Sequence, residues 1–202
     1  MGISYFDKVA WIYPLVDFFG VKTKFYRSIK KSCGLNKDDI VLDVGGGTGI
    51  IAKMLINEVK EITVLDQSKN MLSKIHSDKI KKVLGSAENL NFKDKSFDLI
   101  YLVDSFHHFT NGYNKEEYNK VIDKCIKELL RTLKNNGRLL FIEFDNTSSI
   151  GKKIEFFENR IMKWNSNFYS PKGLVNVLKK YKVKTEVYKI NNYCYAVKVI
   201  KK

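Results

Sequence analysis

The sequence predicts an α/β fold with a doubly wound, mostly parallel sheet of seven strands and an antiparallel last strand. Short apolar runs alternate with segments of helical periodicity, which is typical of parallel strands joined by right-handed crossovers. The last two runs are separated only by Asn191-Asn192, which indicates a hairpin. We expect residues 1–202 to form one domain, because two prolines are too few for a Pro-rich linker.

Residues 1–35 mix aromatic and basic side chains and are expected to form an N-terminal helical segment. Phe6, Ala10 and Tyr13 share helical spacing, and so do basic residues within 24–31. The spacing predicts two helices with apolar inner faces.

The rest of the chain supplies the strands and their connections. The apolar runs predict strands at residues 40–44, 62–65, 80–84, 97–103, 138–144, 183–190 and 193–200. The helical stretches are expected at residues 48–57, 68–77, 115–133, 150–163 and 171–180. The helix at 115–133 has the clearest periodicity; Cys125 lies on its apolar stripe and is expected in the core. Asn135-Asn136-Gly137 is expected to close this helix.

Charge and cysteine content bear on partners and compartment. The net charge is +14, from 36 Lys and Arg against 22 Asp and Glu, and such an excess attracts nucleic acid or acidic membranes. A general abundance of lysine explains it equally well. The three cysteines leave an odd count with no metal-ligand pairing, and no stretch reaches the roughly 20 apolar residues of a membrane span. We therefore expect a cytoplasmic protein.

Four glycines, Gly45, Gly46, Gly47 and Gly49, follow the first strand. Glycines there let the backbone turn tightly and let a ligand lie against it. A dinucleotide fingerprint that starts at Gly45 needs glycine where this chain has Ile50, and no Lys-Ser/Thr pair follows. The ligand is therefore not expected to be held by its phosphates.

Asp66 ends the second strand, 19 residues after Gly47. A carboxylate at this position is placed to accept hydrogen bonds from ribose hydroxyls, each worth roughly 1.5–3 kcal/mol. The alternative is that Asp66 only caps the helix that starts at Ser68. Together with the glycine loop, Asp66 predicts a nucleoside site.

With the stretches 84–92 and 96–100, this order of motifs resembles the class I S-adenosylmethionine-dependent methyltransferases. The resemblance implies a Rossmann-like methyltransferase fold, S-adenosylmethionine as cofactor and S-adenosylhomocysteine as product. It implies cofactor contacts from Tyr13, Asp43, Gly45, Gly46, Gly47, Gly49, Asp66, Gln67, Met71, Ser86, Ala87, Glu88 and Asp104. In the family, the residue at Asp43 orients the loop near the cofactor ammonium. Ser86 departs from the pattern, because many members carry Asp there to bind the adenine amine.

Residues 6–13 and 129–138, with Glu143-Phe144, are most similar to the ubiquinone/menaquinone-biosynthesis C-methyltransferases, a branch of the methyltransferase domain 11 type. In that branch the N-terminal aromatic segment closes over the cofactor, so residues 1–35 are expected to be a lid with Tyr13 in it. The segment before Pro171, where the branch builds part of its substrate pocket, is short here. The quinone acceptor is therefore left open.

His107 and His108 follow the fourth strand and are the candidate catalytic residues. Imidazole titrates near neutral pH, so either could deprotonate an acceptor. The alternative is packing with local hydrogen bonds. A metal is not expected, because only His76 remains elsewhere and no cysteine is near.

The expected function is methyl transfer from S-adenosylmethionine to a small-molecule, apolar or lipid-like acceptor, with peripheral contact to anionic membrane. The sulfonium is already a good leaving group, so the protein mainly aligns the reactants and excludes water. One alternative is RNA methylation, which the charge favours although no recognition motif supports it. Another is a non-catalytic subunit that binds S-adenosylmethionine. No obligate protein partner is evident.

Overall fold

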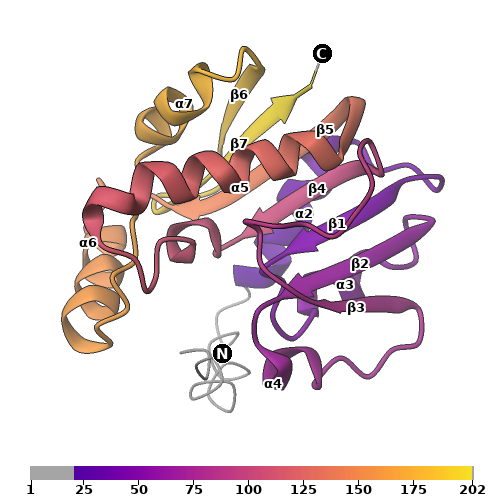
Figure 1. The fold of residues 1–202 in the computed structure, drawn as a ribbon, viewed down its shortest axis with the longest axis horizontal. Helices are drawn as coiled ribbons and strands as arrows, with labels where there is room; N and C mark the ends of the chain where they lie inside the picture. Colours follow the sequence, from indigo (N-terminus) through magenta and orange to yellow (C-terminus); the bar gives the residue numbers. More distant parts are fainter. Residues whose placement is uncertain (1–20, 202) are drawn as a thin grey trace.

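The computed structural model describes residues 21–201, and its centre is a seven-stranded sheet in the order β3-β2-β1-β4-β5-β7-β6 (Figure 1). The strands are β1 (Ile40–Val44), β2 (Glu61–Asp66), β3 (Ile80–Leu84), β4 (Phe97–Val103), β5 (Leu133–Phe144), β6 (Lys184–Lys189) and β7 (Cys194–Ile200). β1 pairs in parallel with β2 and β4, and β4 pairs in parallel with β5. β7 is antiparallel to both β5 and β6. The predicted fold class, with its antiparallel last strand and terminal hairpin, is confirmed.

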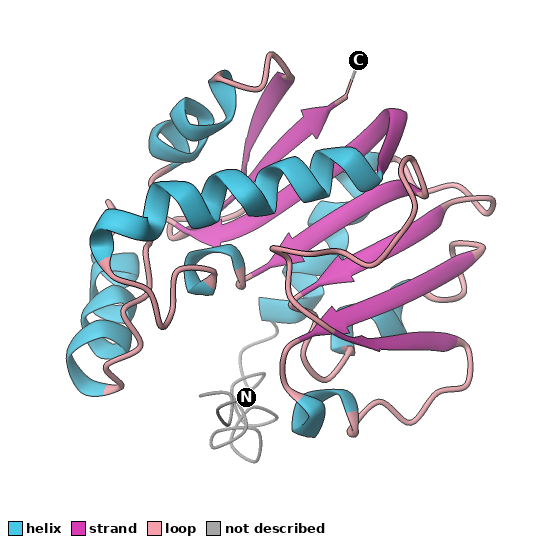
Figure 2. Cartoon of the chain, viewed as in Figure 1, coloured by secondary structure: helices cyan, strands magenta, loops and turns pink. Residues whose placement is uncertain are grey.

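Helices cover both faces of the sheet (Figure 2). They are α2 (Val21–Cys33), α3 (Ile50–Leu55), α4 (Lys69–Leu72), α5 (Tyr118–Thr132), α6 (Ser149–Phe156), which continues as a π-helical segment (Phe157–Ile161), and α7 (Pro171–Lys179). Short 3₁₀ turns lie at Phe106–His108 and Lys115–Glu117. None of the helices within residues 21–201 is long and apolar enough to cross a membrane.

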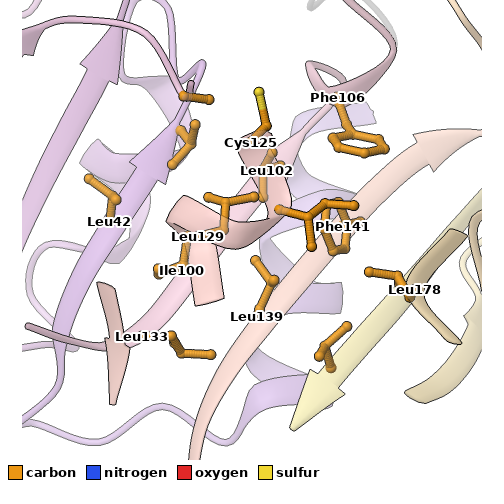
Figure 3. Close-up of a cluster of buried hydrophobic side chains, with 14 of the residues drawn as sticks. Leu42, Ile100, Leu102, Phe106, Cys125, Leu129, Leu133, Leu139, Phe141 and Leu178 are labelled. Carbon is orange, nitrogen blue, oxygen red and sulfur yellow. The ribbon is translucent and has the colours of Figure 1, made fainter. Parts of the chain in front are cut away.

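Alternation along the strands divides the core into two clusters, one on each face of the sheet. Ile100 and Leu102 of β4 belong to the cluster covered by α5 and α7, which also holds Cys125 (Figure 3). Leu99 and Tyr101, at the alternate positions, belong to the cluster covered by α2 and α3. Cys125 is buried, which confirms its predicted place in the core.

The N-terminal segment is described only in part. Residues 1–20, with Tyr13 and the first predicted helix, lie outside the described residues. The second predicted helix is α2, and its apolar inner face is confirmed, because Phe25, Ile29 and Cys33 are buried against the sheet.

Several helix boundaries were predicted wrongly. The helix expected at 68–77 is the short α4, after which the chain turns so that Ile75 enters the core. Asn135-Asn136-Gly137 does not close a helix: α5 has already ended at Thr132, and these residues lie within β5. The strand begins early because Leu133 pairs with Phe97 of β4, ahead of a register shift in that ladder.

Candidate functional site

The candidate site lies where the strand order reverses. From β1 the chain continues outward through β2 and β3, and it then returns to place β4 and β5 on the other side of β1. Ligands of open α/β sheets bind at the carboxyl ends of the strands beside such a switch point. The loop 45–49 after β1 and residues 104–108 after β4 flank this point, and in Figure 1 both strands end on the same side of the sheet.

Two glycines of the loop have different surroundings: Gly46 packs closely against Asp43, and Gly47 borders open space. A Cβ on Gly46 would lie 2.4 to 2.7 Å from the carboxyl atoms of Asp43, closer than any side chain tolerates. Gly47 has a φ of +54°, and a Cβ there would meet nothing within 4 Å. Gly46 is therefore required by packing against Asp43, whereas Gly47 borders the space in which a ligand could lie.

Asp43 lies beneath the loop and is buried. The Tyr101 hydroxyl donates a hydrogen bond to its Oδ2 over 2.9 Å. Burial raises the pKa of Asp43 to about 8, although the hydrogen bond from Tyr101 opposes this shift. Asp43 thus supports the loop from below.

Asp66 joins the glycine loop to the turn after β2. Its Oδ2 accepts from the Gly47 N–H and its Oδ1 from the Ser68 N–H, each over 2.8 Å. The side chain that caps α4 is Ser68, whose Oγ accepts from Met71 N–H. Asp66 is therefore more than a helix cap: it fixes the loop that the sequence assigns to the cofactor.

The segment after β3 carries the other residues expected at the cofactor. Ala87 is buried, and Ser86 Oγ accepts from the Glu88 N–H over 3.2 Å. The Glu88 carboxylate accepts from the Tyr113 hydroxyl over 2.6 Å. On the neighbouring segment after β2, Gln67 is exposed, whereas Met71 is buried.

His107 is buried at the end of β4, where Glu143 and Phe168 hold its ring. Its Nδ1 lies 2.5 Å from Glu143 Oε2 on β5, and its ring stacks on Phe168 with centroids 4.2 Å apart. The other oxygen of Glu143 accepts from the N–H groups of Ser105 and Phe106, over 3.3 and 2.9 Å. Glu143 is itself buried, so it fixes both the ring and the backbone of this turn.

The far side of the His107 ring meets two more acids. Its Nε2 lies 3.6 Å from Glu158 Oε2 and 3.9 Å from Asp104 Oδ1. Burial lowers the pKa of His107, but the charges of Glu143 and Glu158 outweigh it and hold this pKa well above its usual range. Burial has the opposite effect on an acid, and it raises the pKa of Asp104 to about 7.

His108 has different surroundings. Its Nδ1 lies 3.0 Å from Ser166 Oγ, and its ring centroid is 4.0 Å from that of His107. Burial, followed by the charge of His107, lowers its pKa well below the usual value. A neutral imidazole can accept a proton, so His108 suits a general base better than His107 does.

Within residues 21–201, the structure joins the glycine loop to Asp43 and Asp66 and places Asp104 and His108 next to His107. The contacts of Ser86 and Glu88 described above are within their own segment and with Tyr113.

The structure adds Tyr101, Ser105 and Glu158, which sequence reasoning missed, and it gives Glu143 a role. No local signal marks Glu158, because it follows His107 by 51 residues and is surrounded by ordinary helical residues.

Comparison with known proteins identifies close relatives. Residues 42–141 match the sequence model of a family described as a methyltransferase domain. The chain is 32% identical over 162 residues to a demethylmenaquinone methyltransferase of Thermotoga maritima, covering 75% of this chain and 66% of the relative. It is 31% identical over 178 residues to a ubiquinone/menaquinone biosynthesis C-methyltransferase of Pseudoalteromonas translucida, covering 80% and 67%. The chain thus spans about two thirds of the length of these relatives.

Solved structures agree on the fold. A methyltransferase from Thermotoga maritima superposes with a TM-score of 0.77 at 19% identity, covering 98% of this chain and 99% of the other. A methyltransferase in complex with its Trm112 activator, from Haloferax volcanii, gives a TM-score of 0.80 at 14% identity, covering 99% and 98%. The sheet and its order of loops are therefore those of known methyltransferases.

Proposed function

Because this chain belongs to the S-adenosylmethionine-dependent methyltransferase family, with S-adenosylmethionine as its cofactor, we propose that its acceptor is a small apolar molecule of the quinol class. The observation that carries the proposal is the identity of 31–32% to two quinone-pathway C-methyltransferases. The matched region covers about two thirds of each relative, which leaves the acceptor to experiment.

The proposed cofactor site follows the loops of the sheet edge. The glycine loop, Asp43 and Asp66 would hold the methionine and ribose portions, and Ser86, Ala87 and Glu88 would border the adenine. Gln67, Met71 and Asp104 would complete the site. The open space beside Gly47 and the two backbone N–H groups bound by Asp66 support this placement.

The reaction we propose is an in-line displacement. A nucleophilic carbon of the acceptor attacks the methyl group, the sulfur keeps the electron pair of the broken bond, and the carbon loses a proton. His108 is the proposed proton acceptor, because its environment favours the neutral imidazole. His107, held between carboxylates, would position it by ring contact.

An exposed apolar surface supports an acceptor that is delivered from a membrane. Ile150, Phe156, Phe157 and Ile161, on α6 and the π-helical segment, are 45–62% exposed. The same stretch carries four exposed cations, at Lys152, Lys153, Arg160 and Lys163. Apolar side chains beside cations are typical of segments that lie on anionic membrane. We propose that this stretch, residues 150–163, contacts the membrane.

Methyl transfer to defined acceptors tests the proposed function. We would supply labelled S-adenosylmethionine with a demethylated quinol in anionic vesicles, and in parallel with total RNA. Transfer to the quinol supports the proposal. Transfer only to RNA would instead support the second candidate, RNA methylation, which the net charge of +14 favours.

A second arm tests the membrane surface. Phe156→Ser with Phe157→Ser should weaken vesicle binding and quinol methylation, whereas Val187→Ser, which changes an exposed apolar residue on β6, should change neither. Equal vesicle binding by both variants would contradict the proposed contact.

Calorimetric titration with S-adenosylmethionine and S-adenosylhomocysteine tests the site itself. Asp66→Ala should lose binding, whereas Asp78→Ala, an exposed carboxylate on the loop before β3, should bind normally. Transfer to no acceptor with normal cofactor binding would leave the role of a non-catalytic subunit.

A further inference from the structure

Three buried polar atoms lie at the Nε2 side of the His107 ring, beside the glycine loop. They are Asp104 Oδ1, His107 Nε2 and Glu158 Oε2, and none of them has a hydrogen-bond partner among the described residues. His107 is 1% exposed and Glu158 is 8% exposed. An unpaired buried polar atom is costly, and the facing atoms of His107 and Glu158, two deeply buried residues, indicate a bound group.

A proton on His107 does not satisfy this cluster. The Nε2 atom lies 3.6 Å from Glu158 Oε2 and 3.9 Å from Asp104 Oδ1, and both distances are too long for a hydrogen bond. A divalent cation would instead bind both His107 Nε2 and Glu158 Oε2. Ligands of a tetrahedral ion at about 2.0–2.1 Å stand roughly 3.3–3.5 Å apart, so a small inward movement would suffice.

The opposite side of the His107 ring is prepared for such an ion. Glu143 Oε2 lies 2.5 Å from His107 Nδ1. When Nε2 carries the lone pair, Nδ1–H donates a hydrogen bond to this oxygen. Two backbone N–H groups in turn hold Glu143. Metal-ligating histidines characteristically donate their second nitrogen to a carboxylate in this way, which fixes the tautomer and the ring orientation.

His108 offers a third ligand. Nδ1 of His108 lies 3.8 Å from Glu158 Oε2, and one ligand atom from each of His107, His108 and Glu158 falls within 4.8 Å of the others. Glu158 lies on the π-helical segment Phe157–Ile161, and such segments often occur at functional sites. Imidazole with carboxylate oxygens is a donor set that suits zinc and similar divalent transition metals.

We propose that His107, His108 and Glu158 bind one divalent transition-metal ion. The site would lie next to the cofactor loop, because Ser105, two residues before His107, donates to the Val44 carbonyl over 3.0 Å. The sequence predicts no metal, because it places only two histidines together; folding adds Glu158. The ion would join the end of β4 to the π-helical segment. While bound, it would occupy the His108 lone pair, so metal binding and the proposed proton transfer to His108 exclude each other.

Cobalt binding tests the site without any methyl acceptor. Untagged protein, freed of metal with a chelator, is titrated with Co²⁺ and followed by visible absorption and calorimetry, with Zn²⁺ as competitor. We expect one equivalent to bind, with an absorption band typical of four-coordinate cobalt that zinc removes. Absence of binding, or binding with only the spectrum of hydrated cobalt, would overturn the proposal.

Matched variants locate the ion. Glu158→Gln and His107→Gln should each weaken binding at least tenfold, whereas His76→Gln, which changes the exposed histidine before β3, should leave it unchanged. Glu158→Gln keeps the size of the side chain, and circular dichroism would establish that it folds. A folded Glu158→Gln protein with wild-type cobalt affinity would contradict the site. S-adenosylmethionine titration of the same samples separates this outcome from failure of the cofactor site.

Discussion

The two halves of the sheet edge satisfy their buried acids in opposite ways. On the side of β1 and β2, the chain supplies the donors: Tyr101 serves Asp43, and backbone N–H groups serve Asp66. On the side of β4 and β5, unpaired atoms of Glu158 and Asp104 face a histidine. In the first half, the acids already have hydrogen-bond donors from the chain before any ligand binds. In the second half, Glu158 and Asp104 lie farther from the histidine than hydrogen-bond distance, so we expect its behaviour to depend on what binds there.

The largest effect is expected from a change in the first half, at the glycine loop. Gly46→Ala would place a Cβ 2.4–2.7 Å from the Asp43 carboxyl group, so that the loop or Asp43 must move. We expect the free energy of unfolding to fall by about 3 kcal/mol, as for severe overpacking, and S-adenosylmethionine affinity to fall at least about 100-fold. Denaturant unfolding and calorimetry measure the two quantities.

The matched control is Gly112→Ala. Gly112 has a φ of +88° and open space around it, so alanine costs only backbone strain there, about 1–2 kcal/mol, and should spare cofactor affinity. Equal losses of affinity in the two variants would show that close packing against Asp43 is not what shapes the loop.

The next effect concerns the other half. Glu143→Gln removes the charge that holds His107 and weakens the acceptor for the N–H groups of Ser105 and Phe106. Because these groups are buried, we expect a loss of about 2–3 kcal/mol in the free energy of unfolding. Glu61→Gln, which loses an exposed pair with Lys81, should cost about 0.5 kcal/mol. If Glu143→Gln lowers the free energy of unfolding no more than this control does, the turn at residues 105–108 keeps its shape without the Glu143 charge.

The contrast also explains what the sequence could predict. Strands β1 and β4 were predicted with the observed bounds, because buried parallel strands are continuous apolar runs. β3 was also predicted with its observed bounds, although it is a largely exposed edge strand. Helix ends were predicted poorly, because tertiary packing sets them. Ile75 enters the core after the short α4, and Leu133 pairs with Phe97 where the helix was expected to end.

The site divides in the same way. The glycine loop and Asp66 are adjacent to strand ends, so a linear pattern was enough to select them. Glu158 could not be selected, because its contact with His107 depends on how α6 and the π-helical segment fold back on the end of β4. Assigning a metal ligand requires that long-range contact.

A smaller effect should appear in the pH dependence of stability. Burial raises the pKa of Asp43 to about 8 in the folded chain, above its value of about 3.9 when unfolded. The folded state therefore holds this proton more tightly, and the associated stability is lost as pH rises from about 4 through 8.

Asp43→Asn should remove that loss. Between pH 5 and 8, the wild type should lose more stability than the variant by at least about 1.4 kcal/mol, the equivalent of one pKa unit. Urea unfolding at four pH values measures the difference. Asp104 remains in both proteins, so its own titration cancels in the comparison. Parallel curves for the two proteins would show that Asp43 is ionised in the folded state, despite its burial.

The smallest effect is expected at Ser86, where this chain departs from its family. The Ser86 Oγ atom accepts from the Glu88 N–H over 3.2 Å, and a carboxylate at this position could keep that bond and still accept from an adenine amine. Ser86→Asp should therefore tighten S-adenosylmethionine binding about fivefold, close to 1 kcal/mol. Ser86→Ala should weaken it by no more than a similar factor, because only a local hydrogen bond is lost. Calorimetry with adenosine and with inosine, which lacks the amine, tests the assignment, since the gain from Ser86→Asp should vanish with inosine. An equal gain for both nucleosides would place the side chain at position 86 away from the adenine amine. The loop after β3 would then contact the cofactor only through its backbone.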